Sequence, residues 1–248
     1  MIDLHCHILP GVDDGPDTLE QALELARIAV ADGTTHVVAT PHIHPGRWNN
    51  CRDSILGHVV AYQGELARHG ISLQVGFSGE VRLSDNVIGL VAKGDIPFYG
   101  EVEGYRIMLL EFPHGHIIPG SEKLVAWLLK RGIRPLIAHP ERNKQIMKEP
   151  ASLLPFIELG CWLQVTAGAV TGGFGERAQA VAELLLQDDL VTVIASDGHN
   201  NRARPPKLRQ CYQRVAASYG EARAQQLMVE RPAAIAASQF TSTLAAAV

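Results

Sequence analysis

The stretch Ile2-Asp3-Leu4-His5-Cys6-His7 is a short apolar strand that runs directly into two histidines one residue apart. Six further apolar, β-branched runs follow along the chain, and polar residues come directly after most of them. The expected strands are residues 2–5, 35–39, 73–77, 106–111, 134–138, 162–166 and 190–195. Longer amphipathic stretches separate these runs, and this alternation of strand and helix predicts a parallel sheet.

The amphipathic stretches predict the helices. Between the strands they cover residues 18–32, 53–69, 84–93, 121–131, 152–159 and 176–187, and after the last strand residues 206–218, 221–229 and 232–239. Seven strand–helix units can close into a barrel or remain an open, doubly wound sheet. We expect the barrel, because polar residues follow strands all along the chain, whereas an open sheet would concentrate them at one switch point. Residues 43–50 are expected to form an active-site loop and residues 94–104 a surface loop.

Composition limits the class of protein. A chain of 248 residues, 46% of them hydrophobic, suits one α/β barrel or two small domains. We find no repeat, low-complexity tract or linker, and we therefore expect a single domain over residues 1–248. The formal charge of -4 and the scattered Lys and Arg argue against nucleic acid as the main partner.

Location and redox state follow from the apolar runs and the cysteines. No apolar run approaches the roughly 18 residues that span a bilayer, and the first residues lack the basic start and apolar core of a signal peptide. We therefore expect a cytoplasmic protein with no membrane span. The four cysteines, Cys6, Cys51, Cys161 and Cys211, are far apart and form no C-x-x-C pair, so we expect reduced thiols.

Six of the seven expected strands deliver a His, Asp or Glu at or just past their C-terminal ends. These residues are His5, His7, His42, Glu80, Glu111, His139, Asp197 and His199. In a barrel those strand ends converge on one face, where the active sites of this architecture lie. Imidazole and carboxylate together suit Zn²⁺, Mn²⁺ or Fe²⁺. The pattern therefore predicts a metal centre at that face.

Two of these motifs have a spacing that favours metal binding. In His5-Cys6-His7, the period-two alternation of a strand puts both imidazoles on one side and turns Cys6 toward packing. Asp197 and His199 repeat this spacing. A carboxylate such as Glu80 can bridge two ions about 3.5–4 Å apart, which is the usual arrangement for phosphoester hydrolysis.

Each motif alone also has an ordinary structural explanation. An isolated H-x-H or D-x-H is a weak signal, and a buried glutamate can be a paired core acid. It is the joint pattern on six strand ends that indicates a metal centre. The other histidines are expected to pack inside elements, to be solvated, or to lie in loops near the barrel mouth; they are His36, His58, His69, His44, His114 and His116.

The motifs at the strand ends form a recognisable set. They are His5-Cys6-His7, Pro10-Gly11-Val12-Asp13-Asp14-Gly15, Thr40-Pro41-His42, Gly79-Glu80, His139-Pro140-Glu141-Arg142 and Ser196-Asp197-Gly198-His199-Asn200. Together they resemble the polymerase and histidinol phosphatase (PHP) superfamily. More closely, the chain resembles the bacterial manganese-dependent protein-tyrosine phosphatases of capsule and exopolysaccharide loci, the CpsB/YwqE type. The resemblance runs from Met1 to about residue 240, and its most specific element is Val12-Asp13-Asp14-Gly15.

The resemblance implies a fold and a set of metal ligands. The fold is a distorted (β/α)7 TIM-like barrel, the PHP fold, with C-terminal helices, and it carries up to three divalent ions. By resemblance, the first ion is held by His5, His7, Glu80 and Asp197, the second by Glu80, Glu111 and His139, and the third by Asp14, His42 and His199. Asp13 is an alternative to Asp14. Mn²⁺ is the implied metal, although the same ligand types accept Zn²⁺ or Fe²⁺.

The resemblance also implies an activity. The chain would be a metal-dependent phosphomonoester hydrolase that removes phosphate from phosphotyrosine on a protein, namely a bacterial tyrosine autokinase of polysaccharide export. Arg142 and Arg204 match arginines that bind substrate phosphate in this family. The hypothesis is that a metal-bridged hydroxide attacks phosphorus directly, with no covalent intermediate. His42 and Asp197 are the candidate proton donors.

The cysteines give a separate check on this chemistry. A cysteine-dependent tyrosine phosphatase needs an arginine six positions after its nucleophile. Here the residues six positions after the cysteines are Val12, Gly57, Ala167 and Ala217. A thiolate route is therefore excluded by the sequence.

Two other functions stay open at this point. A histidinol-phosphate phosphatase would have the same fold and metals and would differ in substrate alone. A metal-bound, non-catalytic regulatory subunit would bind a partner without turning over any phosphoester. The substrate rim is also open, because Trp48-Asn49-Asn50-Cys51 replaces the more charged stretch expected in this family.

Overall fold

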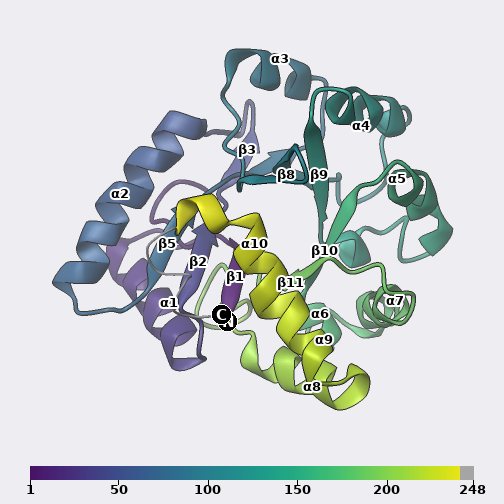
Figure 1. Ribbon diagram of the computed structural model, residues 1–248. Helices are drawn as coiled ribbons and strands as arrows, with labels where there is room; N and C mark the ends of the chain where they lie inside the picture. The colour runs from purple at the N-terminus through teal and green to yellow at the C-terminus, as the bar shows by residue number, and fades with distance from the viewer. Residues whose placement is uncertain (241–248) are drawn as a thin grey trace.

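Residues 1–240 are described by the computed structural model, in which helices surround a barrel of mostly parallel strands (Figure 1). Strands β1 (Ile2–Cys6), β2 (His36–Ala39) and β5 (Gln74–Phe77) pair as a parallel sheet in the order β1-β2-β5. The second sheet runs β11-β10-β9-β8-β6-β3-β4, and β7 pairs with β8. Its strands are β3 (His42–His44), β4 (Trp48–Asn49), β6 (Glu80–Arg82), β7 (Glu101–Val102), β8 (Tyr105–Glu111), β9 (Ile133–Ala138), β10 (Trp162–Thr166) and β11 (Val193–Ala195).

Two strands of the barrel bend and pass from one sheet to the other. β2 continues through residues 40–41 into β3, and β5 continues through residues 78–79 into β6. At the other end of the strand order, a bridge between Cys6 and Gly198 places the segment after β11 beside β1. The amide of His7 donates to the carbonyl of Gly198 there at 2.8 Å. When each bent strand is counted once, the barrel has seven strands, and the distorted β/α barrel is confirmed.

The predicted helices are present, and most of their ends lie within three residues of the expected bounds. They are α1 (Leu19–Ala31), α2 (Arg52–Arg68), α3 (Asn86–Lys93), α4 (Ser121–Leu129), α5 (Leu154–Glu158), α7 (Glu176–Gln187), α8 (Arg209–Tyr219), α9 (Glu221–Gln225) and α10 (Arg231–Ile235). The exceptions are α9 and α10, which end four residues early, where the chain continues as a π-helical turn over Gln226–Glu230 and a 3-10 turn over Ala237–Gln239. The side chain of Thr18 caps α1 by accepting from the amide of Gln21. Helix α8 begins later than expected, because the chain after Pro206 first docks on Asp32, whose carboxylate accepts from the amides of Leu208 and Arg209.

Several elements were not expected from the sequence. Residues 43–50, predicted to be a loop, form most of an antiparallel hairpin of β3 and β4. Residues 94–104, predicted to be a surface loop, include β7, and both Ile96 and Tyr99 are buried. The hydroxyl of Tyr99 donates to the carbonyl of Leu4 at 2.6 Å. A short helix, α6 (Ala167–Val170), follows β10. The short length of these elements hides their periodicity in the sequence.

Side chains fill the barrel interior, and the C-terminal segment closes the end of the barrel at which the strands begin. Inward residues of the strands, such as Ile2, Leu4 and Leu109, form one buried cluster with Ala236 and Phe240. Helix α10, yellow in Figure 1, lies across the strands at this end. The opposite end, where the strands finish, is thereby left to polar side chains.

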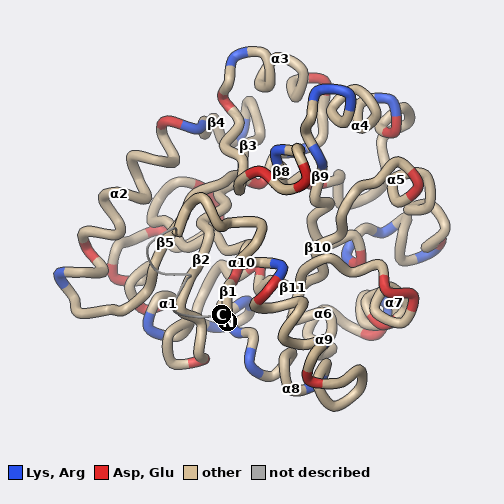
Figure 2. The backbone as a smooth tube through the Cα atoms, in the orientation of Figure 1, with Lys and Arg blue, Asp and Glu red and all other residues tan. Residues whose placement is uncertain are grey.

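Two predictions about the surface can be compared with the structure. Figure 2 shows Lys and Arg interspersed with Asp and Glu along the backbone. Within residues 1–240, none of the helices combines the length and the apolar character that a membrane crossing demands.

Candidate metal centre

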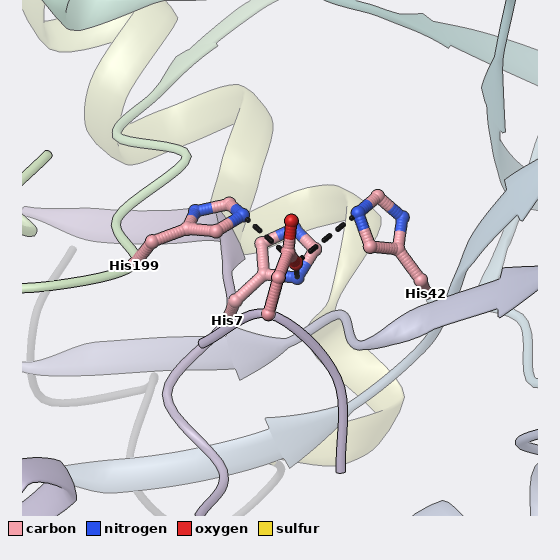
Figure 3. A group of neighbouring side chains, drawn as sticks. His7, His42 and His199 are labelled. Carbon is pink, nitrogen blue, oxygen red and sulfur yellow. Dashed lines mark ion pairs between the residues drawn. The ribbon is translucent and has the colours of Figure 1, made fainter. Parts of the chain in front are cut away.

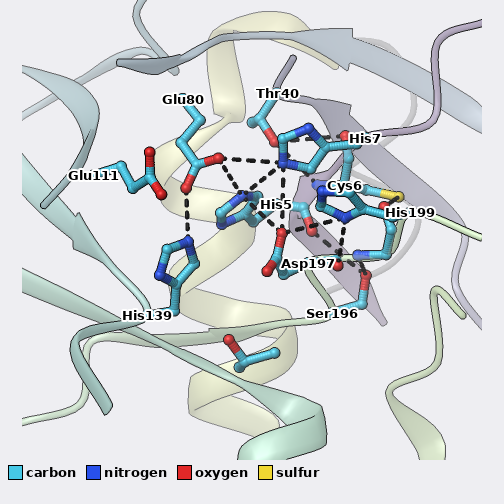
Figure 4. Close-up of polar contacts among 12 residues, drawn as sticks. His5, Cys6, His7, Thr40, Glu80, Glu111, His139, Ser196, Asp197 and His199 are labelled. Carbon is cyan, nitrogen blue, oxygen red and sulfur yellow. Dashed lines mark hydrogen bonds and ion pairs between the residues drawn. The ribbon is translucent and has the colours of Figure 1, made fainter. Parts of the chain in front are cut away.

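The two histidines of the first strand point into the barrel mouth, as predicted (Figure 4). Nε2 of His5 lies 3.3 Å from Nε2 of His7, and both side chains are buried. Cys6, between them, turns the other way, and its thiol donates to the carbonyl of Gly198 at 3.5 Å. The strand alternation therefore brings the two imidazoles together on one side.

Glu80, the first residue of β6, lies between several histidines. Its Oε2 is 3.5 Å from Nε2 of His5, 3.3 Å from Nε2 of His7 and 3.0 Å from Nδ1 of His42. Its other oxygen, Oε1, is 2.7 Å from Nε2 of His139. One carboxylate thus faces two groups of side chains through its two oxygens.

Asp197 and Asp14 bring carboxylates to the same cluster from opposite ends of the chain. Oδ1 of Asp197 is 3.2 Å from Nε2 of His5 and 3.4 Å from Nε2 of His7. Oδ1 of Asp14 is 3.3 Å from Nε2 of His42 and 3.4 Å from Nε2 of His199, around which Figure 3 is drawn. The groups able to hold an ion within residues 1–240 are His7-Asp14-His42-His199, His5-His7-Glu80, His5-His139-Asp197 and His42-Glu80-Glu111.

The structure separates the two neighbouring aspartates of the signature loop. Asp13 is turned away from the cluster, where its Oδ2 accepts from Nδ1 of His7 at 2.6 Å and from the amide of His42 at 3.0 Å. Its Oδ1 accepts from the amide of Gly15 at 2.9 Å. Asp14 is the one of the pair whose carboxylate faces the cluster.

Hydrogen bonds on the far side of the imidazoles set their tautomers. Nδ1 of His5 lies 2.7 Å from Oε1 of Gln164, and Nδ1 of His199 lies 2.9 Å from the backbone carbonyl of Asp197. An amide oxygen and a backbone carbonyl can only accept, so each Nδ1 carries the proton. The Nε2 lone pairs are therefore free to face a cation.

The donor set fits divalent cations. Oε2 of Glu80 and Oδ1 of Asp197 are fully buried and receive no hydrogen bond from any residue in the described part of the chain. Buried carboxylate oxygens without donors are costly unless a cation is bound. His139 and Asp197 also have positive φ values of 33° and 52°. Backbone strain of this kind persists where the surrounding structure imposes it, and functional sites are where it concentrates.

The charges of the cluster stabilise one another against burial. Burial alone would raise the pKa of Asp197, but His5 and Arg142 hold it well below its usual range. Burial opposes a charge on His42, yet the carboxylates of Glu80 and Asp14 raise its pKa to about 9. Positive and negative groups are thus balanced at the base of the site.

Arginines surround the mouth of the site. Arg142 and Arg204 both donate to Oδ2 of Asp197. The guanidinium of Arg142 also lies 4.4 Å from the ring centroid of Phe174. Nη1 of Arg82 is 2.9 Å from Oε2 of Glu111. The two arginines that the sequence indicated for phosphate therefore stand directly beside the cluster.

A cavity of about 330 Å³ opens over these groups. It is lined by charged, imidazole and indole side chains, namely Asp14, His42, His44, Arg47, Trp48, Glu80, Arg82, Glu111, His114, His139, Arg142, Asp197, His199 and Arg204. Its wall brings a predicted phosphate-binding pair of arginines and the predicted ligands into one space. His44 and His114, which were expected in loops near the mouth, are part of that wall.

Comparison with known proteins shows to which family the chain belongs. Residues 1–237 match the family described as "Capsular polysaccharide synthesis, CpsB/CapC". The chain belongs to this family. It is 34% identical over 204 residues to tyrosine-protein phosphatase YwqE of Bacillus subtilis, covering 82% of this chain and 79% of that protein. It is 29% identical over 245 residues to tyrosine-protein phosphatase CpsB of Streptococcus pneumoniae, covering 97% of this chain and 100% of that protein.

Solved structures agree with this family membership. A chain from a study of YwqE of Bacillus subtilis and CpsB of Streptococcus pneumoniae, described as unique metal-dependent tyrosine phosphatases, superposes with a TM-score of 0.88 at 31% identity. That match covers 96% of this chain and 95% of the solved one. A lactonase from Listeria monocytogenes matches with a TM-score of 0.54 at 13% identity and shares the fold alone.

Three of the four thiols of this CpsB/CapC-family chain are buried and unsuited to nucleophilic attack. All four cysteines are free, as expected. Burial raises the pKa of the Cys161 and Cys211 thiols to about 12 in each case. Burial likewise raises the pKa of Cys6 well above its usual value. These three thiols stay protonated at neutral pH, in agreement with the sequence argument against a thiolate route.

Three residues of the site were not found from the sequence. Gln164 orients His5, and a polar residue inside the apolar strand 162–166 was the available signal. Arg82 lies just past Glu80 on β6, a strand too short to be recognised. Arg47 lies between β3 and β4, and the pairing of these two strands left no mark in the sequence.

Proposed function

We propose that this chain is a metal-dependent protein-tyrosine phosphatase, like the family members that it resembles. The observation that carries the proposal is Glu80, whose two oxygens face separate sets of imidazoles directly beside Arg142 and Arg204. Such a shared carboxylate suits neighbouring divalent ions, and the arginines suit an anionic substrate. The names of the relatives support the substrate class.

The proposed ligand sets are those that the family resemblance implies. One ion would be held by His5, His7, Glu80 and Asp197, a second by Glu80, Glu111 and His139, and a third by Asp14, His42 and His199. Contacts of His5 with Asp197 and of His139 with Glu80 support the first two sets, although Glu111 is grouped with His42 and Glu80, and His139 with His5 and Asp197. We propose Asp14 rather than Asp13 for the third set, because Asp13 already accepts from His7. Mn²⁺ is the proposed metal, and the same ligand types also accept Zn²⁺ or Fe²⁺.

The chemistry of the site follows from charge. When bound, divalent ions supply a water of lowered pKa and offset charge on the phosphoryl oxygens. Arg142 and Arg204 would donate to the equatorial oxygens, where charge is greatest in the transition state. The tyrosine leaving group has a pKa near 10 and needs little help from an acid. His42 and Asp197 stay the candidate proton donors: neighbouring positive groups hold Asp197 ionised, and His42 can donate a proton only when its imidazole does not bind the third ion.

The proposal extends to substrate, location and organisation. We propose that the substrate is a phosphotyrosine protein, a tyrosine autokinase of polysaccharide export, and that the enzyme works in the cytoplasm as a single domain over residues 1–248. Family membership in capsular polysaccharide synthesis supports the first point.

The test is phosphate release from a phosphotyrosine peptide with and without Mn²⁺. The metal-loaded wild type should turn the peptide over, and the His5→Ala/His7→Ala variant should lose activity by at least about 100-fold because two of the four ligands of the first ion are removed. Histidinol phosphate, assayed beside the peptide, should be the poorer substrate. Full activity of that variant in chelator contradicts the proposal, and turnover of no phosphoester by the metal-loaded wild type points to a regulatory subunit instead.

A further inference from the structure

The β3–β4 hairpin forms part of the cavity wall. Apart from His42, none of its residues belongs to a proposed set of metal ligands or to the proposed phosphate-binding pair, Arg142 and Arg204. It carries Trp48, where the sequence departs from the charged stretch expected in this family. The indole stacks on the imidazole of His42, with centroids 4.6 Å apart and planes inclined by 13°. The guanidinium carbon of Arg47 lies 4.0 Å from the indole centroid. The indole of Trp48 thus contacts both the imidazole of His42 and the guanidinium of Arg47, and serves to position Arg47.

The hairpin is tied to the metal-binding loops. The amide of Arg47 donates to the carbonyl of His44 at 2.9 Å, which closes the turn. The side-chain amide of Asn50 donates to the carbonyls of Val12 and His42 at 3.0 and 2.9 Å. The backbone of Arg47 is therefore held at a defined place on the rim, and the contact with the indole restricts its guanidinium.

The arginine on this hairpin differs from the others that line the cavity. Arg142 and Arg204 both donate to a single carboxylate, and Arg82 lies 2.9 Å from an oxygen of Glu111. Arg47 is exposed, and among residues 1–240 its guanidinium contacts the indole of Trp48 and forms no ion pair. Its charge is thus available to a group that the substrate brings.

We propose that Arg47 is a specificity-determining residue that binds an anionic group one or two residues from the phosphotyrosine. The inference rests on the proposed function and names its substrate class more closely: phosphotyrosine peptides with an acidic neighbour. The guanidinium lies 4.0 Å from the indole that stacks on His42, so it is one side chain away from the proposed metal ligands. An extended peptide advances about 3.3 Å per residue, so a near neighbour of the phosphotyrosine reaches this position. A guanidinium pairs equally well with a carboxylate or a second phosphate.

The experiment compares kcat/KM for phosphotyrosine peptides of equal length at neutral pH with Mn²⁺. In separate series, the residue next to the phosphotyrosine and the residue two positions away, on either side, is Ala, Asp, Lys or phosphoserine. The wild type should prefer Asp over Lys by roughly fivefold at low salt, the scale of a good exposed ion pair, and the ratio should shrink as salt is added. Arg47→Ala should bring this ratio close to one, and Arg47→Glu should invert it. A preference for the phosphoserine peptide without one for Asp would identify phosphate as the anion.

The control is Arg27→Ala, which removes another exposed arginine, paired with Glu24 on α1, and should keep the wild-type ratio. A wild-type ratio of one for both anionic peptides, or a ratio that Arg47→Ala leaves intact, overturns the inference. Absence of turnover on every peptide contradicts the proposed function instead. In that case the same peptides, labelled with fluorescein, are compared by fluorescence anisotropy, and equal binding of the Asp, phosphoserine and Lys peptides overturns the inference.

Discussion

Gln164 accounts for the orientation of a histidine that the sequence alone could only place on a strand. Its amide oxygen accepts from Nδ1 of His5 at 2.7 Å, so the free lone pair of His5 lies on Nε2, toward Glu80. Asp13 does the same for His7. The sequence showed the residue types at the strand ends. The partners behind them could not be predicted, because they come from elements far away in the chain.

Loss of this partner should weaken metal binding without removing a ligand. We expect Gln164→Leu to lower the affinity for Mn²⁺ by at least about tenfold, since His5 loses the acceptor that fixes its ring and tautomer. Calorimetric titration with Mn²⁺ measures the change. Gln187→Leu, at the exposed end of α7, is the control. Equal affinities of Gln164→Leu and the wild type would contradict this role.

Glu141 gives the stability of the protein a dependence on pH. Burial raises its pKa from 4.5 to about 7, and one of its oxygens accepts from the amide of Thr166 at 2.8 Å. The folded state keeps this proton up to about pH 7, whereas the unfolded chain loses it near pH 4.5. The contribution to stability is therefore complete below the unfolded pKa and is lost as the pH rises through the folded one.

Glu141→Gln removes this charge. We expect the variant to gain thermal stability relative to the wild type as the pH is raised from about 5 to 8. Thermal unfolding followed by circular dichroism at several pH values, with Mn²⁺ held constant, measures the difference in Tm. The same difference at every pH would show that Glu141 does not titrate in this range.

At the scale of elements, β10 and α7 have the bounds that the sequence predicts. Gly160 lies two residues before the apolar run of β10, and Gly175 directly precedes the amphipathic run of α7. β3 and β6 were missed. Each has three residues, too few to show alternation, and each continues a predicted strand after a bend. The bends matter for the site, since they carry His42 and Glu80 to the mouth of the barrel. Their cause is long-range pairing, which a local pattern does not contain.

The signature loop after β1 depends on the glycine that ends it. A Cβ on Gly15 would lie 2.4 Å from the backbone oxygen of His7, which cannot move without displacing the strand end. We expect Gly15→Ala to destabilise the fold by about 1–3 kcal/mol and to weaken binding of the ion nearest Asp14. Urea unfolding and Mn²⁺ titration measure both effects.

A second glycine provides the control for this prediction. Gly57 lies in α2, is exposed, and has nothing within 4 Å of the position that a Cβ would take. Gly57→Ala should stabilise the protein by about 0.5–1 kcal/mol through helix propensity. A Gly15→Ala variant as stable as the wild type would refute the close contact.

At the scale of the whole molecule, the barrel topology explains why residues from both ends of the chain share one site. The C-terminal segment closes the barrel where the strands begin. The opposite end, where the strands finish, brings Asp14, Glu80 and Asp197 together. The sequence predicted this convergence, because parallel strands in a barrel have all their carboxyl ends on one face. It could not predict Arg47, whose position depends on how a short hairpin folds over that face.

The central claim is that these strand-end side chains hold several divalent ions together. It is tested most directly by a crystal structure of the protein grown with Mn²⁺, using anomalous density to locate the metal. The account predicts at least two peaks, on either side of the Glu80 carboxylate, with ligands from His5, His7, His139 and Asp197. Density that is absent there, or that lies elsewhere on the molecule, would contradict it.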